Sequence, residues 1–136
     1  MNAAETIDEA ELVLVLSTEA DPERAEALAR QLLERRLVAC VSLLPVQSLY
    51  RWQGGIESAA EVKLLLKSLP GRLAALREAL HSLHSYQTPE WIVLQGRSAL
   101  GYAAWLGAEL ASEPGASGGD DGTDGTDGTE GADQPR

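Results

Sequence analysis

The sequence has no phenylalanine and, among its 136 residues, only one cysteine, one methionine and two histidines. Without Phe, the core must pack mainly on Leu, Val and Ala, with Trp52, Trp91 and Trp105 as its bulky members. The single Cys40 cannot close an internal disulfide, and its apolar neighbours favour a small core residue. No apolar run approaches the roughly 20 residues that cross a bilayer, so we expect no membrane partner.

Basic residues are also scarce, since 11 Lys and Arg stand against 21 Asp and Glu, for a formal net charge of −10. Binding to phosphate backbones requires clustered Lys and Arg, so we expect no nucleic-acid partner. The segment 1–11 carries four acids and no base, the reverse of the basic start of a signal peptide. These features together predict a cytoplasmic protein.

Composition divides the chain into three parts. Residues 112–136 contain no large apolar side chain and repeat Asp-Gly-Thr three times. Such a segment cannot bury enough surface to offset the entropy lost on ordering. We therefore expect a disordered acidic tail at 112–136, a flexible arm at 1–10 and one folded domain at 11–111.

Within that domain the hydrophobic pattern alternates between strand and helix character. Apolar, β-branched runs predict strands, and apolar residues at intervals of three and four predict helices. The predicted strands are 11–18, 37–53 with Pro45 at a bulge or edge position, 57–68 and 91–94; the predicted helices are 22–36, one opening at 70–71, and 99–111. Gly54-Gly55 reads as the turn of a hairpin. The order β-α-β-β-α-β predicts an α+β, ferredoxin-like sandwich with an antiparallel sheet and an extra C-terminal helix.

Two of these strands carry apolar side chains on both faces. Segments 12–16 (LVLVL) and 91–94 (WIVL) are apolar at every position. The two crossover helices must share one face of the sheet, and an antiparallel sheet with a solvated second face would alternate apolar and polar residues. The second face therefore needs a cover, and the pattern favours a homo-oligomer over a monomer.

The densest polar segment lies between the second helix and the last strand. His81 and His84 are three residues apart, a spacing that allows shared metal ligation, although histidines near a helix C-terminus also favour the helix dipole. For nucleophilic catalysis the candidates are Cys40 with His84, or Ser17 with Thr18 at the end of the first strand, where a hydroxyl could face a cleft; nothing local activates either. We predict a binding protein and not an enzyme.

Four blocks then carry a family resemblance: 39–45 (ACVSLLP), 48–57 (SLYRWQGGIE), 61–68 (EVKLLLKS) and 84–90 (HSYQTPE). In order and spacing they resemble the CutA divalent-ion-tolerance family. The resemblance implies a ferredoxin-like protomer in a tight homotrimer similar to the PII signalling proteins, with sheet pairing between subunits. It covers roughly residues 11–110.

The resemblance also implies a metal function. The family is associated with tolerance of divalent metals and with copper binding, and no catalysed reaction is established for it. Its metal positions, a Cys closing the first strand and a His-His pair, correspond here to Ser17, Leu83 and His84. Copper prefers thiolate and imidazole, so the resemblance implies weak binding of copper or another divalent cation. The expected metal ligands are His84, Ser17 and Cys40.

The remaining family positions point to clefts between subunits. There the resemblance implies a site for a metal ion or a small anion, lined by Trp52, Glu61, Lys67, Tyr86 and Glu90. Two alternatives stay open: a trimeric structural scaffold, and a PII-like small-molecule sensor without a metal function.

Overall fold

The computed structural model describes residues 8–111, so the predicted tail and most of the predicted arm lie outside the described residues. Within them the order of elements is β-α-β-β-α-β-α, as the sequence predicts. The elements are β1 (Glu9–Glu19), α1 (Pro22–Glu34), β2 (Cys40–Trp52), β3 (Gly55–Ser68), the 3₁₀ turn η2 (Pro70–Arg72), α2 (Leu73–Leu83), β4 (Ile92–Ala99) and α3 (Leu100–Leu110).

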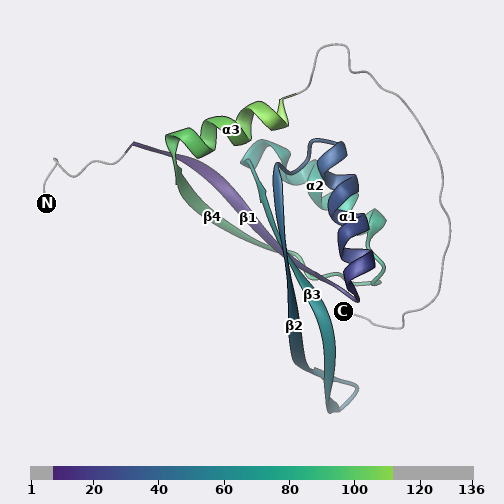
Figure 1. Cartoon of the computed structure of the whole chain (residues 1–136). Helices are drawn as coiled ribbons and strands as arrows, with labels where there is room; N and C mark the ends of the chain where they lie inside the picture. Colours follow the sequence, from purple (N-terminus) through teal and green to yellow (C-terminus); the bar gives the residue numbers. More distant parts are fainter. Residues whose placement is uncertain (1–7, 112–136) are drawn as a thin grey trace, which may run out of the picture.

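The four strands form one antiparallel sheet in the order β2-β3-β1-β4. Helices α1 and α2 lie together on one side of it, whereas α3 crosses the far ends of β1 and β4 (Figure 1). This is the predicted ferredoxin-like topology with an additional C-terminal helix. None of the helices within residues 8–111 is long and apolar enough to span a membrane.

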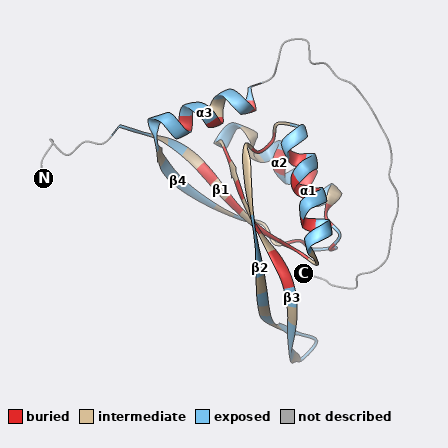
Figure 2. Cartoon of the chain, in the orientation of Figure 1, coloured by how far each residue is buried: buried red, intermediate tan, exposed pale blue. Residues whose placement is uncertain are grey.

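The core lies between the sheet and the two crossover helices. In α1 the residues Ala25, Leu28, Ala29 and Leu32 are buried, as their helical spacing predicts. Asp21 begins this helix by accepting the Arg24 backbone N–H at 2.8 Å, and Pro22 follows at the first helical position. Figure 2 shows the buried residues concentrated where α1 and α2 meet the central strands.

Several predicted boundaries differ from the structure. β1 begins at Glu9, inside the predicted arm, because Glu9 and Ala10 pair with Ala99 and Ser98. β4 is longer than predicted and runs on through Gly96 and Arg97 to Ala99. Gln95, Arg97 and Ser98 end the apolar run of β4, but all three still pair with β1.

The β2–β3 hairpin is long and its tip projects beyond the helices (Figure 1). β2 passes through Pro45 without a break and forms an edge of the sheet, where a missing N–H is tolerated. The predicted turn at Gly54-Gly55 is wrong by one residue. The turn residues are Gln53 and Gly54, with φ of 51° and 83°, and Trp52 pairs with Gly55. Positive φ at both turn positions matches the twist of a hairpin.

Helix α3 closes the far end of the molecule and is tied down by two arginines. Arg36 Nη1 donates to the Glu109 carbonyl oxygen at 2.6 Å, and Arg72 Nη2 donates to the Leu110 carbonyl oxygen. These bonds satisfy carbonyls that the end of a helix leaves unpaired. They hold α3 against the C-terminal end of α1 and the start of α2.

Candidate functional site

The end of β1 and the segment after α2 meet in the interior, where His84 joins them. The His84 side chain is fully buried. Its Nε2 lies 2.7 Å from the Thr18 carbonyl oxygen, and because a carbonyl only accepts, Nε2 carries the proton. Nδ1 therefore has the lone pair, and it accepts the Tyr86 backbone N–H at 2.9 Å. Both ring nitrogens are engaged within the fold.

This environment favours the neutral imidazole. Burial lowers the pKa of His84 below its ordinary value of 6.5, while the neighbouring Glu19 acts in the raising direction. A metal ligand needs a free ring lone pair, and His84 presents none in this arrangement. Since Ser17 is a poor copper ligand and Leu83 is none, the residues at the implied copper positions do not fit that ion.

Glu19 is a second buried group at this junction, and no local sequence pattern predicts its burial. It is 1% exposed. Its Oε1 accepts the Ala20 N–H at 2.9 Å and the Ser85 hydroxyl at 2.7 Å, and its Oε2 accepts the Ser85 N–H at 3.0 Å. A buried carboxylate is tolerated when it is hydrogen-bonded in this way. Glu19 thereby fastens the α2–β4 connection to β1.

A polar cluster lies beside this junction on the sheet face opposite the helices, called here the second face. Lys63 Nζ donates to both carboxylate oxygens of Glu90, at 3.0 and 3.1 Å, and the Thr18 hydroxyl donates to the same carboxylate. Glu61, on the same face of β3 as Lys63, accepts the Tyr86 hydroxyl at 2.5 Å. The structure thus brings Glu61, Tyr86 and Glu90 into one cluster.

The three predicted metal ligands do not converge. Ser17 pairs with Leu64 and faces the helices, whereas Cys40 pairs with Lys67 and lies on the second face. The Ser17 hydroxyl is buried and has no hydrogen-bond partner. Across residues 8–111, no three His, Cys, Asp or Glu side chains are grouped to hold a metal ion.

Two predicted cleft residues lie away from the polar cluster within the protomer. Trp52 closes the hairpin tip, and Lys67 lies at the opposite end of the hairpin. Lys67 Nζ donates to the Ser42 hydroxyl at 3.0 Å and contacts Cys40 Sγ at 3.6 Å. Any site that contains Trp52 and Glu90 together must therefore draw them from different subunits.

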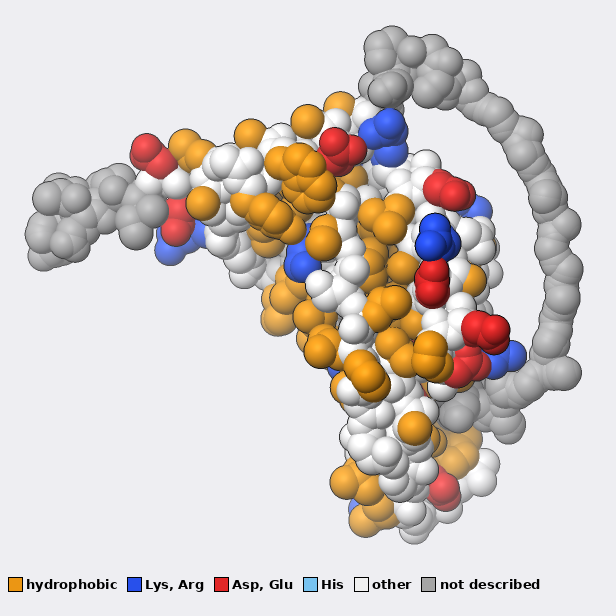
Figure 3. All heavy atoms as spheres, viewed as in Figure 1, with side chains coloured by type: hydrophobic (Ala, Val, Ile, Leu, Met, Phe, Trp, Pro, Cys, Tyr) orange, Lys and Arg blue, Asp and Glu red, His pale blue; other side chains and the backbone are white. Residues whose placement is uncertain are grey.

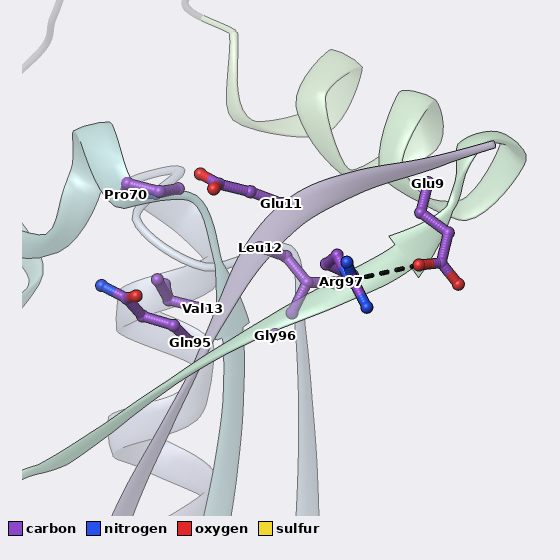
Figure 4. A pocket seen from close by; sticks show the side chains of 8 residues that line it. All are labelled: Glu9, Glu11, Leu12, Val13, Pro70, Gln95, Gly96 and Arg97. Carbon is purple, nitrogen blue, oxygen red and sulfur yellow. Dashed lines mark ion pairs between the residues drawn. The ribbon is translucent and has the colours of Figure 1, made fainter. Parts of the chain in front are cut away.

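A separate groove opens at the other end of β1. Figure 4 shows it between the β1–β4 ladder and Pro70, with the Arg97–Glu9 ion pair of 3.2 Å on one side. Its lining residues are Glu9, Glu11, Leu12, Val13, Pro70, Gln95, Gly96 and Arg97. None of the predicted site residues belongs to it.

Sequence reasoning did not assign Lys63, Glu19 or Ser85 to the site, and it named Thr18 only as a hydroxyl that could face a cleft. Lys63 lies on the face of β3 opposite the core, where strand alternation puts it. The burial of Glu19 has no counterpart in local sequence, because its hydrogen-bond donors at Ser85 are 66 residues away.

Strand order, helix placement and the long β2–β3 hairpin define a ferredoxin-like α+β protein. The model of the CutA1 divalent ion tolerance protein family matches residues 13–109. The chain belongs to this family, and the resemblance inferred from four sequence blocks is confirmed.

Relatives from bacteria agree with this assignment. The divalent-cation tolerance protein CutA of Citrobacter koseri is 43% identical over 74% of this chain and 89% of its own. CutA of Pectobacterium atrosepticum is 45% identical over 72% of this chain and 91% of its own. Both cover the folded domain rather than only a motif.

Solved structures agree as well. CutA from Synechococcus elongatus is 40% identical, with a TM-score of 0.74 over 77% of this chain and 95% of that one. A CutA from Archaeoglobus fulgidus described as periplasmic is 30% identical, with a TM-score of 0.72 over 74% of this chain and 99% of that one. The cellular compartment of the present chain thus stays a prediction.

Proposed function

We propose that the protein is a homotrimeric binding or regulatory protein of the divalent-cation-tolerance type, acting in the cytoplasm without catalysing a reaction. Its ligand, a divalent cation or a small anion, binds in clefts between subunits. The single cysteine suits a reducing compartment, where structural disulfides are rare.

Exposure of the second face is the observation that carries this proposal. Leu44, Ile92 and Leu94 are each more than 40% exposed there. Figure 3 shows hydrophobic side chains over α3, down the middle of the molecule and at the hairpin tip. Apolar patches of this extent mark interaction surfaces in soluble proteins. A second and third copy of the chain are the cover that the family resemblance implies.

The hairpin supplies a way for copies to join. β2 and β4 are the edge strands of the sheet and retain unpaired backbone groups, which suit strand addition. At the projecting tip, Leu49 is 73% and Ile56 is 71% exposed. We assign both side chains to contacts with a neighbouring subunit.

The ligand cleft would form where this tip meets the polar cluster of the next protomer. Trp52 from the hairpin would then approach Glu61, Tyr86 and Glu90, which the protomer already holds together. Two carboxylates beside Lys63 give the cluster both charges, which suits recognition of a small polar or charged molecule.

The engaged nitrogens of His84 favour a second candidate, a PII-like sensor of small molecules without a metal function. In that case the trimer forms and the clefts bind an organic ligand, while copper and zinc leave them unchanged.

Native mass spectrometry with and without copper or zinc tests these proposals, since it counts subunits and bound ions together. Trimers are expected at micromolar concentration in both conditions. Trimers whose retained copper or zinc is unaffected by Glu61→Gln with Glu90→Gln support the sensor, and a stably folded single chain at high dilution contradicts the assembly on which both candidates depend.

A further inference from the structure

The two histidines of the chain have opposite accessibility. His84 is fully buried and uses both ring nitrogens inside the fold. His81, three residues earlier near the end of α2, is exposed. The predicted sharing of one metal by this pair is therefore incompatible with the described conformation.

His81 also has the tautomer that a metal ligand needs. Its Nδ1 lies 2.9 Å from the Arg77 carbonyl oxygen, so the neutral ring holds its proton on Nδ1. Nε2 then carries a lone pair on an exposed residue. A backbone carbonyl that fixes one ring nitrogen while the other binds metal is the usual outer-shell arrangement for a ligating histidine.

A carboxylate lies on the same surface of the helix. Glu78 precedes His81 by three residues, both are exposed, and residues at this spacing are neighbours on a helix surface. We propose that His81 and Glu78 form a separate divalent-metal site on the surface of α2, in which His84 takes no part. Imidazole nitrogen with carboxylate oxygen suits Cu²⁺ or Zn²⁺, and water would complete the coordination.

This site adds a binding mode to the proposed function and does not depend on it. Both ligands belong to one helix of one protomer, so the site exists whether or not subunits assemble. Two protein ligands predict weaker binding than the three that a catalytic zinc site usually has.

Trp91 supplies a probe for the test. Its ring centroid lies 6.1 Å from that of His81, so paramagnetic Cu²⁺ bound at His81 is expected to quench its fluorescence. Replacing Trp52 and Trp105 by Phe leaves Trp91 as the only tryptophan. Titrating Cu²⁺ into this protein should give saturable quenching that EDTA reverses.

Variants in the same background separate the two histidines. His81→Gln should weaken copper binding by at least about tenfold, since loss of even an outer-shell partner of a metal ligand costs about 10–100-fold, and Glu78→Gln should weaken it by a smaller factor. His84→Gln should leave the affinity unchanged. No saturable quenching, or loss of binding in His84→Gln but not in His81→Gln, would overturn the proposal.

Because His84→Gln could disturb the fold, the ¹⁵N resonances of both rings in the unmutated protein provide a second measurement. Added Zn²⁺ should shift His81 Nε2 and leave both nitrogens of His84 in place. A zinc-dependent shift at His84 alone contradicts the proposal. Subunit counting by native mass spectrometry is separate from both readouts, so failure of the metal site and failure of the trimer are distinguishable.

Discussion

At the scale of single residues, the burial of His84 links protonation to stability. Because burial lowers its pKa below 6.5, the folded protein keeps His84 neutral at pH values where the unfolded chain protonates it. The unfolded state then binds more protons, so stability is complete above about pH 6.5 and falls as the pH decreases below it.

We therefore expect the free energy of unfolding to fall between pH 7.5 and 5.5, by up to about 1.4 kcal/mol per pH unit in the lower part of this range. Urea titrations at fixed protein concentration measure it. His84→Gln should flatten this slope, whereas His81→Gln, which alters an exposed ring, should retain it. Equal slopes in all three proteins would contradict this account of His84.

Ser17 offers a contrasting prediction, because its buried hydroxyl has no partner. Removing an unsatisfied buried polar group relieves its desolvation cost, so Ser17→Ala should raise the free energy of unfolding by about 1 kcal/mol. Ser68 is the matched control, since it is equally buried but donates to the Leu37 carbonyl oxygen at 2.7 Å. Ser68→Ala should lower stability by about 1–3 kcal/mol. Urea midpoints that move the same way in both variants would refute the distinction.

These residues show where local sequence information ends. The division of β3 into one face with Glu61, Lys63 and Lys67 and another with Val62, Leu64 and Leu66 is readable from a period of two and matches the burial pattern. The inward rotation of His84 was not, because it depends on the Thr18 carbonyl 66 residues earlier in the chain. Strand periodicity assigns each side chain of β3 to a face of the sheet. Hydrogen bonds to residues distant in the sequence decide whether a ring nitrogen of His84 is free.

At the scale of elements, prediction succeeded where a hydrophobic pattern continued over many residues, and it failed at turns and at the ends of strands. The stripe of α1 and the Asp21-Pro22 start determined that helix almost residue by residue. The end of β4 was missed because Gln95, Gly96 and Arg97 look like a loop, yet β1 pairs with all three. Backbone pairing with a neighbour, which no local pattern reports, extends the strand.

The hairpin turn gives a prediction at this scale. Gln53 adopts φ of 51°, a region that costs an L-residue with a Cβ roughly 1 kcal/mol. Gln53→Gly should therefore raise the free energy of unfolding by about 0.5–1 kcal/mol, read from the urea midpoint. Gly54→Ala is the control, because Gly54 has φ of 83° and an added Cβ would meet no atom within 4 Å. It should destabilise by strain alone, and a neutral result there would show that the turn relaxes.

At the scale of the whole molecule, the apolar second face follows from strands that carry apolar side chains on both faces. Strands with apolar residues on both faces cannot be satisfied by helices on one side, and α3 leaves Ile92 and Leu94 exposed. This incompleteness was predictable from segments 12–16 and 91–94. The surface that covers this face was not predictable, because the sequence pattern shows which strand faces are apolar and not which surface packs against them.

If neighbouring subunits cover this surface, charges at the hairpin tip should weaken the assembly. Leu49→Asp with Ile56→Asp places two carboxylates where both side chains are more than 70% exposed in the protomer, so the protomer's own packing should change little. Sedimentation equilibrium at micromolar concentration should show the unmodified protein as a trimer and the double variant shifted towards single chains. Leu33→Asp, on α1 and 38% exposed, is the control and should remain trimeric. Were the double variant as fully trimeric as the unmodified protein, the tip would have no part in the interface, and Trp52 would lose its route to the cluster around Glu90.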